Sequence, residues 1–444
     1  MQDFLTVFKK NKGAKPIAQN DIRVPNFNDK NREFDAHTFV LWGDASEVDF
    51  SNAGDKFPYI RFSTETKFPS VDKMPKGFNP EQVLENGKAP GLNIANLHAM
   101  GITGKGLTIA IIDKPLNTEH VEIKDNIVHY ESIGFPENAT ADYHGNAVSS
   151  LLAGKTVGVA PDAQIVYFAA PASKLHQPIM NKDFQEELRR YFPANMDFDR
   201  TIKDIVGGRY SRDKEFKQQI DNIVQTLPDN IKKRLFTPDK EIDFVPHAKA
   251  LKKILFMNAR LPQDKKISAV SISWGRLSDD PECKKLIQQL IESGVAVFTT
   301  ADSAVYYGDK AKYTTIDRKM NANPDSPESY TAGFWKKHEN QPKNCLLIPS
   351  GGRTLAGFYS DTDYIYCGID GGMSWAAPYL TGVYALAKQI APNLTPHHFF
   401  EIAQQTAISN GKTGNNKIVQ PQKIIQQLQN EIVLQQQQIV GKDM

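Results

Sequence analysis

The chain has 444 residues, a length that fits two or three domains or one large α/β domain with insertions. Hydrophobic residues make up 40% and charged residues 23%, as in soluble globular proteins, so the chain can bury a sizeable core. The formal net charge is +2, from 53 basic and 51 acidic residues, and it gives no electrostatic reason to expect nucleic acid or a membrane as a partner.

The cysteines and the N-terminal residues give information on the cellular compartment of the protein. Cys283, Cys345 and Cys367 are odd in number and far apart, which does not fit a disulfide framework and favours a reducing environment. The first 20 residues contain no apolar run long enough for a signal peptide or a membrane span. We therefore expect a cytoplasmic protein, with secretion left open if a leader has been trimmed from this sequence.

Residues 1–88 are polar and rich in Asn, Asp and Lys. Prolines at positions 58, 69, 75, 80 and 90 interrupt this part of the chain and argue against long helices. A short strand is predicted at residues 59–62. We interpret residues 1–88 as an N-terminal extension with limited structure.

A mainly apolar run, Leu107 to Ile112, ends at Asp113. Such a run suits a strand that is buried on both faces, as in a parallel sheet. An acid directly after that strand lies at its carboxyl end, where open α/β sheets place their ligands. The alternative is a loop aspartate that caps the next segment.

A helix is predicted to follow His144, because small and apolar residues recur at helical spacing up to Gly154. The histidine would lie at the N-terminal end of this helix, where it could be structural or catalytic. Residues 164–169 then read as a second central strand. These elements begin an α/β pattern.

Residues 172–265 are rich in lysine and glutamine and contain helical stretches at 184–191, 213–225 and 245–259. We interpret them as an inserted helical subdomain whose lysines form a solvated surface. A strand at 267–272, a helix at 281–293 and a strand at 295–300 come next. This alternation predicts an α/β fold, with a mainly parallel central sheet and helices on both faces.

The segment Gly371-Gly372-Met373-Ser374 precedes a predicted helix, whose apolar positions recur every three or four residues up to Ile390. Glycines permit a tight approach to the helix, and a serine there lies among unpaired backbone N–H groups that can stabilise negative charge. The alternative is an ordinary N-cap serine.

The tail, residues 420–440, is rich in glutamine and carries an apolar stripe. This stripe predicts a helix that docks on the core rather than one that recruits a partner.

Four segments together resemble the subtilase family of serine proteases: the strand that ends at Asp113, the helix start at His144-Gly145, Gly158 to Pro161, and Gly372 to Pro378. The order Asp, His, Ser is that of subtilisin. The resemblance covers about residues 91–410. It implies a subtilisin-like three-layer fold and a serine endopeptidase of the intracellular type, without a signal peptide, that acts on polypeptides.

The resemblance also implies roles for individual residues. Ser374 would be the nucleophile, His144 the general base and then acid, and Asp113 the group that orients the histidine. The chemistry requires this set because a serine hydroxyl attacks only when an oriented imidazole can accept its proton. The segment Ser273-Trp274-Gly275 resembles the family segment that pairs with an extended peptide, which implies a role in substrate binding.

Two stretches depart from the family pattern. Where relatives have Ala-Gly-Asn, whose asparagine donates to the oxyanion, this chain has Ala301-Asp302-Ser303. An ungapped match puts Ser303 at the asparagine position and a one-residue shift puts Asp302 there; the hydroxyl could donate, whereas an ionised carboxylate could not. The second departure is Asp113-Lys114-Pro115, where relatives have a small hydroxyl residue and glycine after the aspartate. These departures motivate an alternative function, a catalytically weak or inactive subtilase-like protein that binds peptides or a partner.

The loop before Gly158 is short and lacks the segment that ligates calcium in many relatives, so no cofactor is predicted, and calcium elsewhere is left open. We expect three parts. Residues 1–88 are an N-terminal extension that could occupy the cleft and inhibit the enzyme. Residues 89–410 are the peptidase domain with the insertion at about 172–265, and residues 411–444 are a helical tail.

Overall fold

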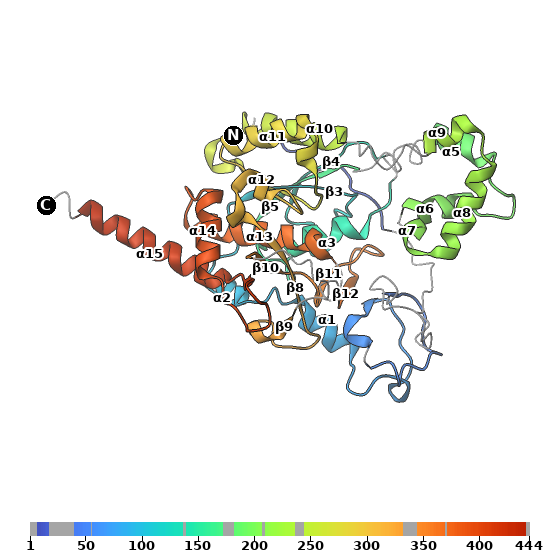
Figure 1. Cartoon of the computed structure of the whole chain (residues 1–444), viewed down its shortest axis with the longest axis horizontal. Coiled ribbons are helices and arrows are strands. Elements are labelled where there is room, and N and C mark those ends of the chain that lie inside the picture. The colour runs from blue at the N-terminus through green and yellow to red at the C-terminus, as the bar shows by residue number, and fades with distance from the viewer. Residues whose placement is uncertain are drawn as a thin grey trace.

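The computed structural model of the chain is shown in Figure 1. It describes residues 7–16, 40–54, 56–135, 139–171, 182–206, 209–235, 244–331, 344–368 and 371–440.

A sheet of five strands forms the centre of the molecule, in the order β4-β5-β3-β6-β7. All neighbouring strands in it are parallel. The strands are β3 (Thr108–Asp113), β4 (Ile127–Ser132), β5 (Gln164–Ala169), β6 (Ile267–Ile272) and β7 (Ala296–Thr299). Every residue of β3 is buried, as expected of a strand covered on both faces. The predicted parallel sheet is confirmed.

Helices cover both faces of this sheet, which gives three layers (Figure 1). On one face α3 (Tyr143–Ala153) and α13 (Gly372–Ile390) pack against Ile109 and Ile111 of β3. On the other face α10 (Val245–Asn258) and α11 (Pro281–Glu292) pack against Ala110 and Ile112. Alternate residues of one strand therefore enter two different cores. The parallel strands and the three layers confirm the predicted fold class.

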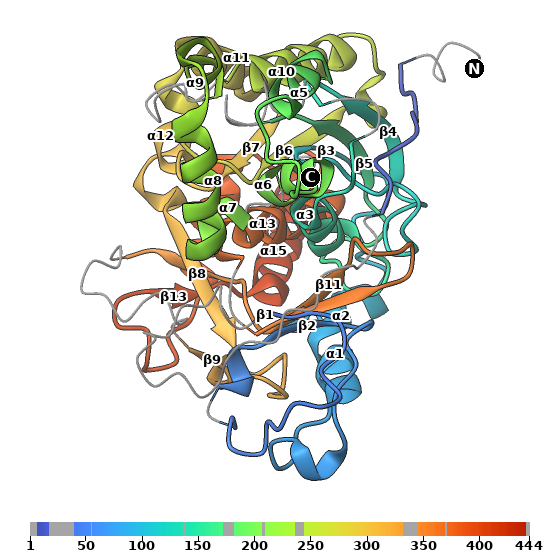
Figure 2. The same ribbon diagram turned by 90° about the vertical axis from the view of Figure 1, so that its right-hand side faces the viewer.

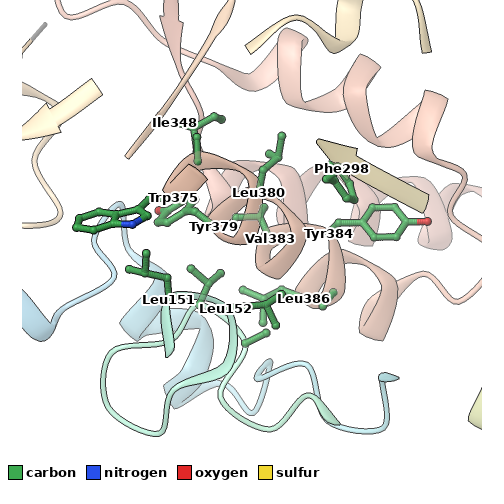
Figure 3. Packing of buried hydrophobic residues seen from close by; sticks show 14 of the residues in the cluster. Leu151, Leu152, Phe298, Ile348, Trp375, Tyr379, Leu380, Val383, Tyr384 and Leu386 are labelled. Atoms are coloured by element: carbon green, nitrogen blue, oxygen red, sulfur yellow. The ribbon is translucent and has the colours of Figure 1, made fainter. Parts of the chain in front are cut away.

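Helix α13 runs through the larger core and is buried from Trp375 to Ala387. Figure 3 shows its side chains between α3, the end of β7 and the strand β10. The labelled residues of this cluster are Leu151, Leu152, Phe298, Ile348, Trp375, Tyr379, Leu380, Val383, Tyr384 and Leu386. The helix that carries Ser374 is thus held rigidly.

Two smaller sheets lie beyond α13. One has the order β13-β10-β8-β9 and the other the order β1-β2-β12-β11. Their strands are β1 (Val40–Leu41), β2 (Arg61–Ser63), β8 (Tyr313–Arg318), β9 (Tyr330–Thr331), β10 (Leu346–Pro349), β11 (Arg353–Ala356), β12 (Tyr364–Cys367) and β13 (Lys417–Ile418). The remaining helices of the main body are α1 (Pro80–Lys88), α2 (Ile94–Ala99), α12 (Ser303–Tyr307), α14 (Pro396–Thr406) and α15 (Pro421–Val440).

Residues 40–54 and 56–88 are folded, so the prediction of limited structure was wrong for this part of the chain. Strand β2 pairs antiparallel with β12, some 300 residues away in sequence, and begins at Arg61 rather than at residue 59. A separate apolar cluster lies beneath this sheet. Its fully or nearly fully buried members include Leu41, Phe50, Phe57, Ile60, Phe62 and Val83. The aromatic side chains of this segment bury a large apolar surface, which its polar overall composition does not indicate.

The inserted region divides by its packing into two parts. Five helices share a core of their own: α5 (Lys182–Arg189), α6 (Phe198–Val206), α7 (Arg209–Arg212), α8 (Lys214–Thr226) and α9 (Asp229–Leu235). Figure 1 shows this unit standing apart from the central sheet, and Figure 2, which looks from that side, shows it in front of α3 and α13. Helix α10, by contrast, packs on the central sheet.

Residues 7–16 lie along β4, the edge strand of the central sheet. Lys10 forms a parallel bridge with Tyr130, and Lys15 forms one with Thr140. The Lys9 carbonyl accepts from the Tyr130 N–H at 3.1 Å. This segment therefore covers the edge of the sheet and runs toward the start of α3.

Helix α15 is docked over its first half only. Ile424, Ile425 and Leu428 are buried in the larger core, whereas Val433 and Leu434 are exposed. Figure 1 shows the end of the helix projecting from the body. Across the described residues, no helix combines the length and the apolar character that a membrane crossing requires.

The two leucines of α15 provide a test of this arrangement. Leu428→Ala is expected to lower the free energy of unfolding by about 2–5 kcal/mol, because its side chain is 2% exposed and truncation leaves a cavity. Leu434→Ala, on the same helix but 57% exposed, should change it by about 0.5 kcal/mol or less. Chemical denaturation measures both. Equal effects of the two substitutions would contradict the docking of the first half.

Candidate active site

Asp113 and His144 form a short hydrogen bond at the carboxyl end of the central sheet. Asp113 is the last residue of β3, and its Oδ1 accepts from His144 Nδ1 at 2.6 Å and from the Lys114 N–H at 2.8 Å. Because an ionised carboxylate only accepts, Nδ1 carries the proton in this pair. The other ring nitrogen, Nε2, is then left as a proton acceptor.

The start of α3 is tied to the loop after β3. Asp142 is the N-cap of α3, and its Oδ1 accepts from the His144 N–H at 2.8 Å. Its other oxygen lies 3.2 Å from Lys114 Nζ, and its N–H donates to the Pro115 carbonyl at 2.9 Å. The Lys114-Pro115 departure from the family pattern therefore contributes contacts that hold the histidine. The sequence analysis did not identify the Lys114–Asp142 pair.

Gly145, next to the histidine, lies in close contact with the loop after β3. A Cβ at this position would be 2.6 Å from the Lys114 carbonyl oxygen and 2.8 Å from the Pro115 carbonyl oxygen. Neither backbone oxygen could move without displacing the loop that carries Asp113. The glycine therefore permits the short distance between Asp113 and His144.

Ser374 lies in the first turn of α13, three residues after the N-cap Gly371. It is partly exposed, whereas the residues that follow it are buried. Helix geometry supplies no carbonyl for the N–H groups of a first turn, so the Ser374 N–H is available to a ligand. This position gives the hydroxyl and an anion-stabilising donor to the same residue.

Ser374 and Ser273 are joined by two hydrogen bonds. The Ser273 hydroxyl donates to the Ser374 carbonyl at 2.6 Å, and the Ser374 hydroxyl donates to the Ser273 carbonyl at 3.4 Å. The first bond has a clear cause. The Ser374 carbonyl would normally accept from the N–H of residue 378, but Pro378 has none, and the Ser273 hydroxyl takes its place. The end of β6 is thereby fastened to the start of α13.

Trp274 and Gly275 continue from Ser273 toward the loop after β7. The Trp274 carbonyl accepts from the Thr300 N–H at 3.4 Å. A Cβ on Gly275 would lie 2.8 Å from the Ala301 Cβ, so the two loops are in close contact there. The segment predicted to bind substrate therefore lies between Ser374 and the loop that carries Asp302 and Ser303.

The two candidates for a second oxyanion donor have other partners. The Ser303 hydroxyl accepts from the Thr299 N–H at 3.3 Å and donates to the Thr299 carbonyl at 3.4 Å. Asp302 Oδ2 accepts from the Ser278 N–H at 3.2 Å. Both residues are buried, and among the described residues neither side chain is hydrogen-bonded to Ser374.

The structure brings Asp113 to His144 and Ser273 to Ser374, but within the described residues no hydrogen bond joins the His144 ring to the Ser374 hydroxyl. Such bonds are often long without substrate and shorten in the complex.

Among the described residues, no group of three or more His, Cys, Asp or Glu side chains is arranged to hold a metal ion. Of the residues that position the site, Pro378 could have been found from sequence, because it lies four residues after Ser374.

Comparison with known proteins gives a family match. The model of the subtilase family matches residues 104–423. The major intracellular serine protease of Bacillus subtilis (strain 168) is 29% identical over 120 residues. That match covers 24% of this chain and 33% of the relative, so the chain aligns with about a third of that protein's length.

Solved structures of low sequence identity also match. Fervidolysin from Fervidobacterium pennivorans, described as a keratinolytic enzyme related to subtilisin, is 15% identical with a TM-score of 0.43, over 76% of this chain and 45% of that one. A cold-adapted subtilisin-like serine proteinase is 14% identical with a TM-score of 0.38, over 71% and 89%. The prenylagaramide maturation protease PagA is 13% identical with a TM-score of 0.42, over 76% and 98%.

The bond between Ser273 and Ser374 can be tested with a pair of substitutions. Ser273→Ala should lower the free energy of unfolding by about 1 kcal/mol, because the partly buried Ser374 carbonyl loses its partner. Adding Pro378→Ala supplies an N–H at the helical position, so the double variant should lose less stability than the two single variants combined. Urea denaturation of the four proteins gives the coupling energy. If the stability losses of the two single variants simply add in the double variant, the missing N–H of Pro378 does not explain the Ser273–Ser374 bond.

Proposed function

Because the chain belongs to the subtilase family of serine proteases, we propose that it is a serine endopeptidase, which hydrolyses peptide bonds in polypeptides through an acyl-enzyme intermediate. The observation that carries this proposal is the 2.6 Å bond between Asp113 and His144, at the sheet edge where Ser374 lies in the first turn of α13. A carboxylate that holds Nδ1–H leaves Nε2 to act as a base. Such an oriented base supports the proposed activation of Ser374.

In the proposed reaction, the Ser374 hydroxyl leaves its bond to the Ser273 carbonyl and attacks the substrate carbonyl carbon. His144 Nε2 takes the hydroxyl proton and later gives it to the leaving amine. Asp113 keeps the imidazole in the required tautomer and stabilises its charged form. Water then hydrolyses the acyl-enzyme with His144 again acting as base.

The negative oxygen of the tetrahedral intermediate would be stabilised by the Ser374 N–H. A second donor is not assigned, because the Ser303 hydroxyl is bonded to Thr299 and the Asp302 carboxylate only accepts. In subtilisin, loss of one such donor lowers kcat about 10²–10³-fold, whereas loss of the serine or histidine lowers it about 10⁶-fold. The proposal is therefore a slow protease rather than an inactive protein.

The division of the chain into a peptidase domain, an insertion and two terminal segments is also a proposal. We keep residues 89–410 as the peptidase domain and 411–444 as the tail, and place the independent insertion at α5–α9, because α10 packs on the central sheet. Strands β1 and β2 form a sheet with β12 and β11, so we place any inhibitory segment before residue 40. Residues 7–16 support such a role, because the Lys15 carbonyl accepts from Ala141, three residues before His144.

The proposed location is the cytoplasm. Cys283, Cys345 and Cys367 are all free and buried, which fits a reducing compartment. The curated relative of Bacillus subtilis is itself named an intracellular protease.

A second candidate is a subtilase-like protein that binds peptides with little or no turnover. It is favoured by the absence, within the described residues, of a bond between His144 and Ser374, and by the missing oxyanion donor. Rapid cleavage of casein would exclude it.

A fluorophosphonate probe tests the proposed nucleophile. The intact protein should be labelled and should cleave casein, whereas Ser374→Ala should abolish labelling and lower turnover about 10⁶-fold. His144→Ala should slow labelling to a similar extent, because the serine loses its base. Ser409→Ala, an exposed serine remote in sequence, is the matched control. Labelling that persists in Ser374→Ala, or its absence from the folded wild-type protein, would contradict the proposed function.

A further inference from the structure

Arg61, the first residue of β2, is a buried cation on the face of its sheet that is turned toward the candidate site. It is 4% exposed and pairs with Cys367, the last residue of β12. Residues directly opposite each other in an antiparallel pair place their side chains on the same face. The next pair, Phe62 and Tyr366, packs into the separate apolar cluster on the other face. Arg61 and Cys367 therefore face the larger core, of which Cys367 is a member.

The Arg61 side chain reaches the start of α3. Its guanidinium carbon, Cζ, lies 5.0 Å from the centroid of the Tyr143 ring, within the range of a cation–π interaction. The Tyr143 ring stands at 88° to the His144 ring, with 6.2 Å between the two centroids. Tyr143 also contacts Phe358, in the loop between β11 and β12, with 6.1 Å between the ring centroids. Arg61 thus supports the aromatic ring that lies beside the proposed general base.

The strand that carries Arg61 also holds the chain that leads to Ser374. The Gly368 N–H, directly after β12, donates to the Ile60 carbonyl at 3.0 Å. A Cβ on Gly368 would lie 2.3 Å from the Pro58 carbonyl oxygen, so the two backbones are in close contact there. These contacts fix the point at which the chain leaves β12, six residues before Ser374.

The groups that face the Arg61 cation include a neutral thiol and an aromatic ring. Burial raises the pKa of the Cys367 thiol to about 11, although the nearby Arg61 charge lowers it. The thiol is therefore protonated, while the guanidinium keeps its charge in proteins. Sulfur and the face of an aromatic ring are polarisable, and the ring attracts a cation. The same guanidinium therefore interacts with the end of β12 and with Tyr143.

This double contact matters because, within the described residues, no hydrogen bond joins the His144 ring to the Ser374 hydroxyl. The distance between the two groups then depends on how the start of α3 and the segment after β12 are placed. A misplacement of about 1 Å in a reacting group can lower turnover about 10²-fold. A residue that contacts both segments can fix this distance.

We propose that Arg61 is a positioning residue, which holds the Tyr143–His144 start of α3 in place relative to the segment that leads from β12 to Ser374. This proposal rests on the proposed peptidase function and deepens it. It assigns part of the geometry of the site to a residue that precedes the proposed peptidase domain, and it implies that β2 remains part of the active enzyme.

The experiment compares Arg61→Met with Arg61→Lys, using a peptide that the wild-type protein cleaves and the fluorophosphonate probe. Methionine keeps an unbranched apolar chain but removes the charge, whereas lysine keeps a cation for the Tyr143 ring. Arg61→Met should lower kcat and the labelling rate about 10–10²-fold with KM little changed, because the reacting groups are displaced while peptide binding is retained. Arg61→Lys should recover most of the lost kcat.

Two further comparisons separate positioning from stability. Phe62→Leu is the matched control, because Phe62 is the next residue of β2 but is buried in the separate cluster. It should lower the free energy of unfolding and leave the kcat of the folded protein near the wild-type value. Tyr143→Leu should lower kcat about as far as Arg61→Met, and the double variant should lower it little further, because both act through one contact. Tyr143→Phe, which keeps the ring, should retain most of kcat.

The outcomes distinguish this proposal from the proposed function. A wild-type kcat in folded Arg61→Met, or an equal loss of kcat in Phe62→Leu, would overturn the positioning role while leaving the peptidase intact. If Arg61→Met does not fold, the Tyr143 variants decide, and equal kcat values of Tyr143→Leu and Tyr143→Phe would overturn the role. If the wild-type protein cleaves no peptide and the probe does not label Ser374, the peptidase function fails and this proposal fails with it.

Discussion

The parallel direction of the central strands is the constraint on which the candidate site depends. Because neighbouring strands in the order β4-β5-β3-β6-β7 all run the same way, the residues that follow β3, β6 and β7 meet at one edge. Asp113, Ser273 and Asp302 are far apart in sequence but come together there for this single reason. Helix α13 then supplies Ser374 at the same edge, held through the Ser273–Ser374 bonds.

Much of the fold could be predicted from sequence, because the central strands are covered on both faces and are therefore mainly apolar. The predicted strands at 107–112, 164–169 and 267–272 all appear, as do the helices after Gly371 and at 281–293. Apart from the short strand predicted at 59–62, the segment between residues 40 and 88 could not be assigned in this way. Its buried aromatic residues follow no helical or strand period, and the partner of β2 lies some 300 residues away at β12.

Three motifs named Asp113, His144 and Ser374, and the structure joins the first two by a hydrogen bond. Of the contacts that hold these residues, only the effect of Pro378 could have been inferred from sequence. The Lys114–Asp142 ion pair joins two loops whose approach depends on Gly145, and no local pattern announces it. The limit of the insertion was missed for a similar reason: α10 resembles its neighbours in sequence, and only its packing on the central sheet separates it from α5–α9.

Asp113 and Asp302 occupy similar positions in the fold but have different partners. Both are buried acids at or just after the carboxyl ends of strands in the same sheet. Asp113 accepts from His144 and from the Lys114 N–H, and such a satisfied carboxylate fixes the geometry around it. Asp302 Oδ2 accepts from the Ser278 N–H and so joins the loops that follow β6 and β7. The partners of each carboxylate, rather than its burial or its location, thus determine which segments that acid holds together.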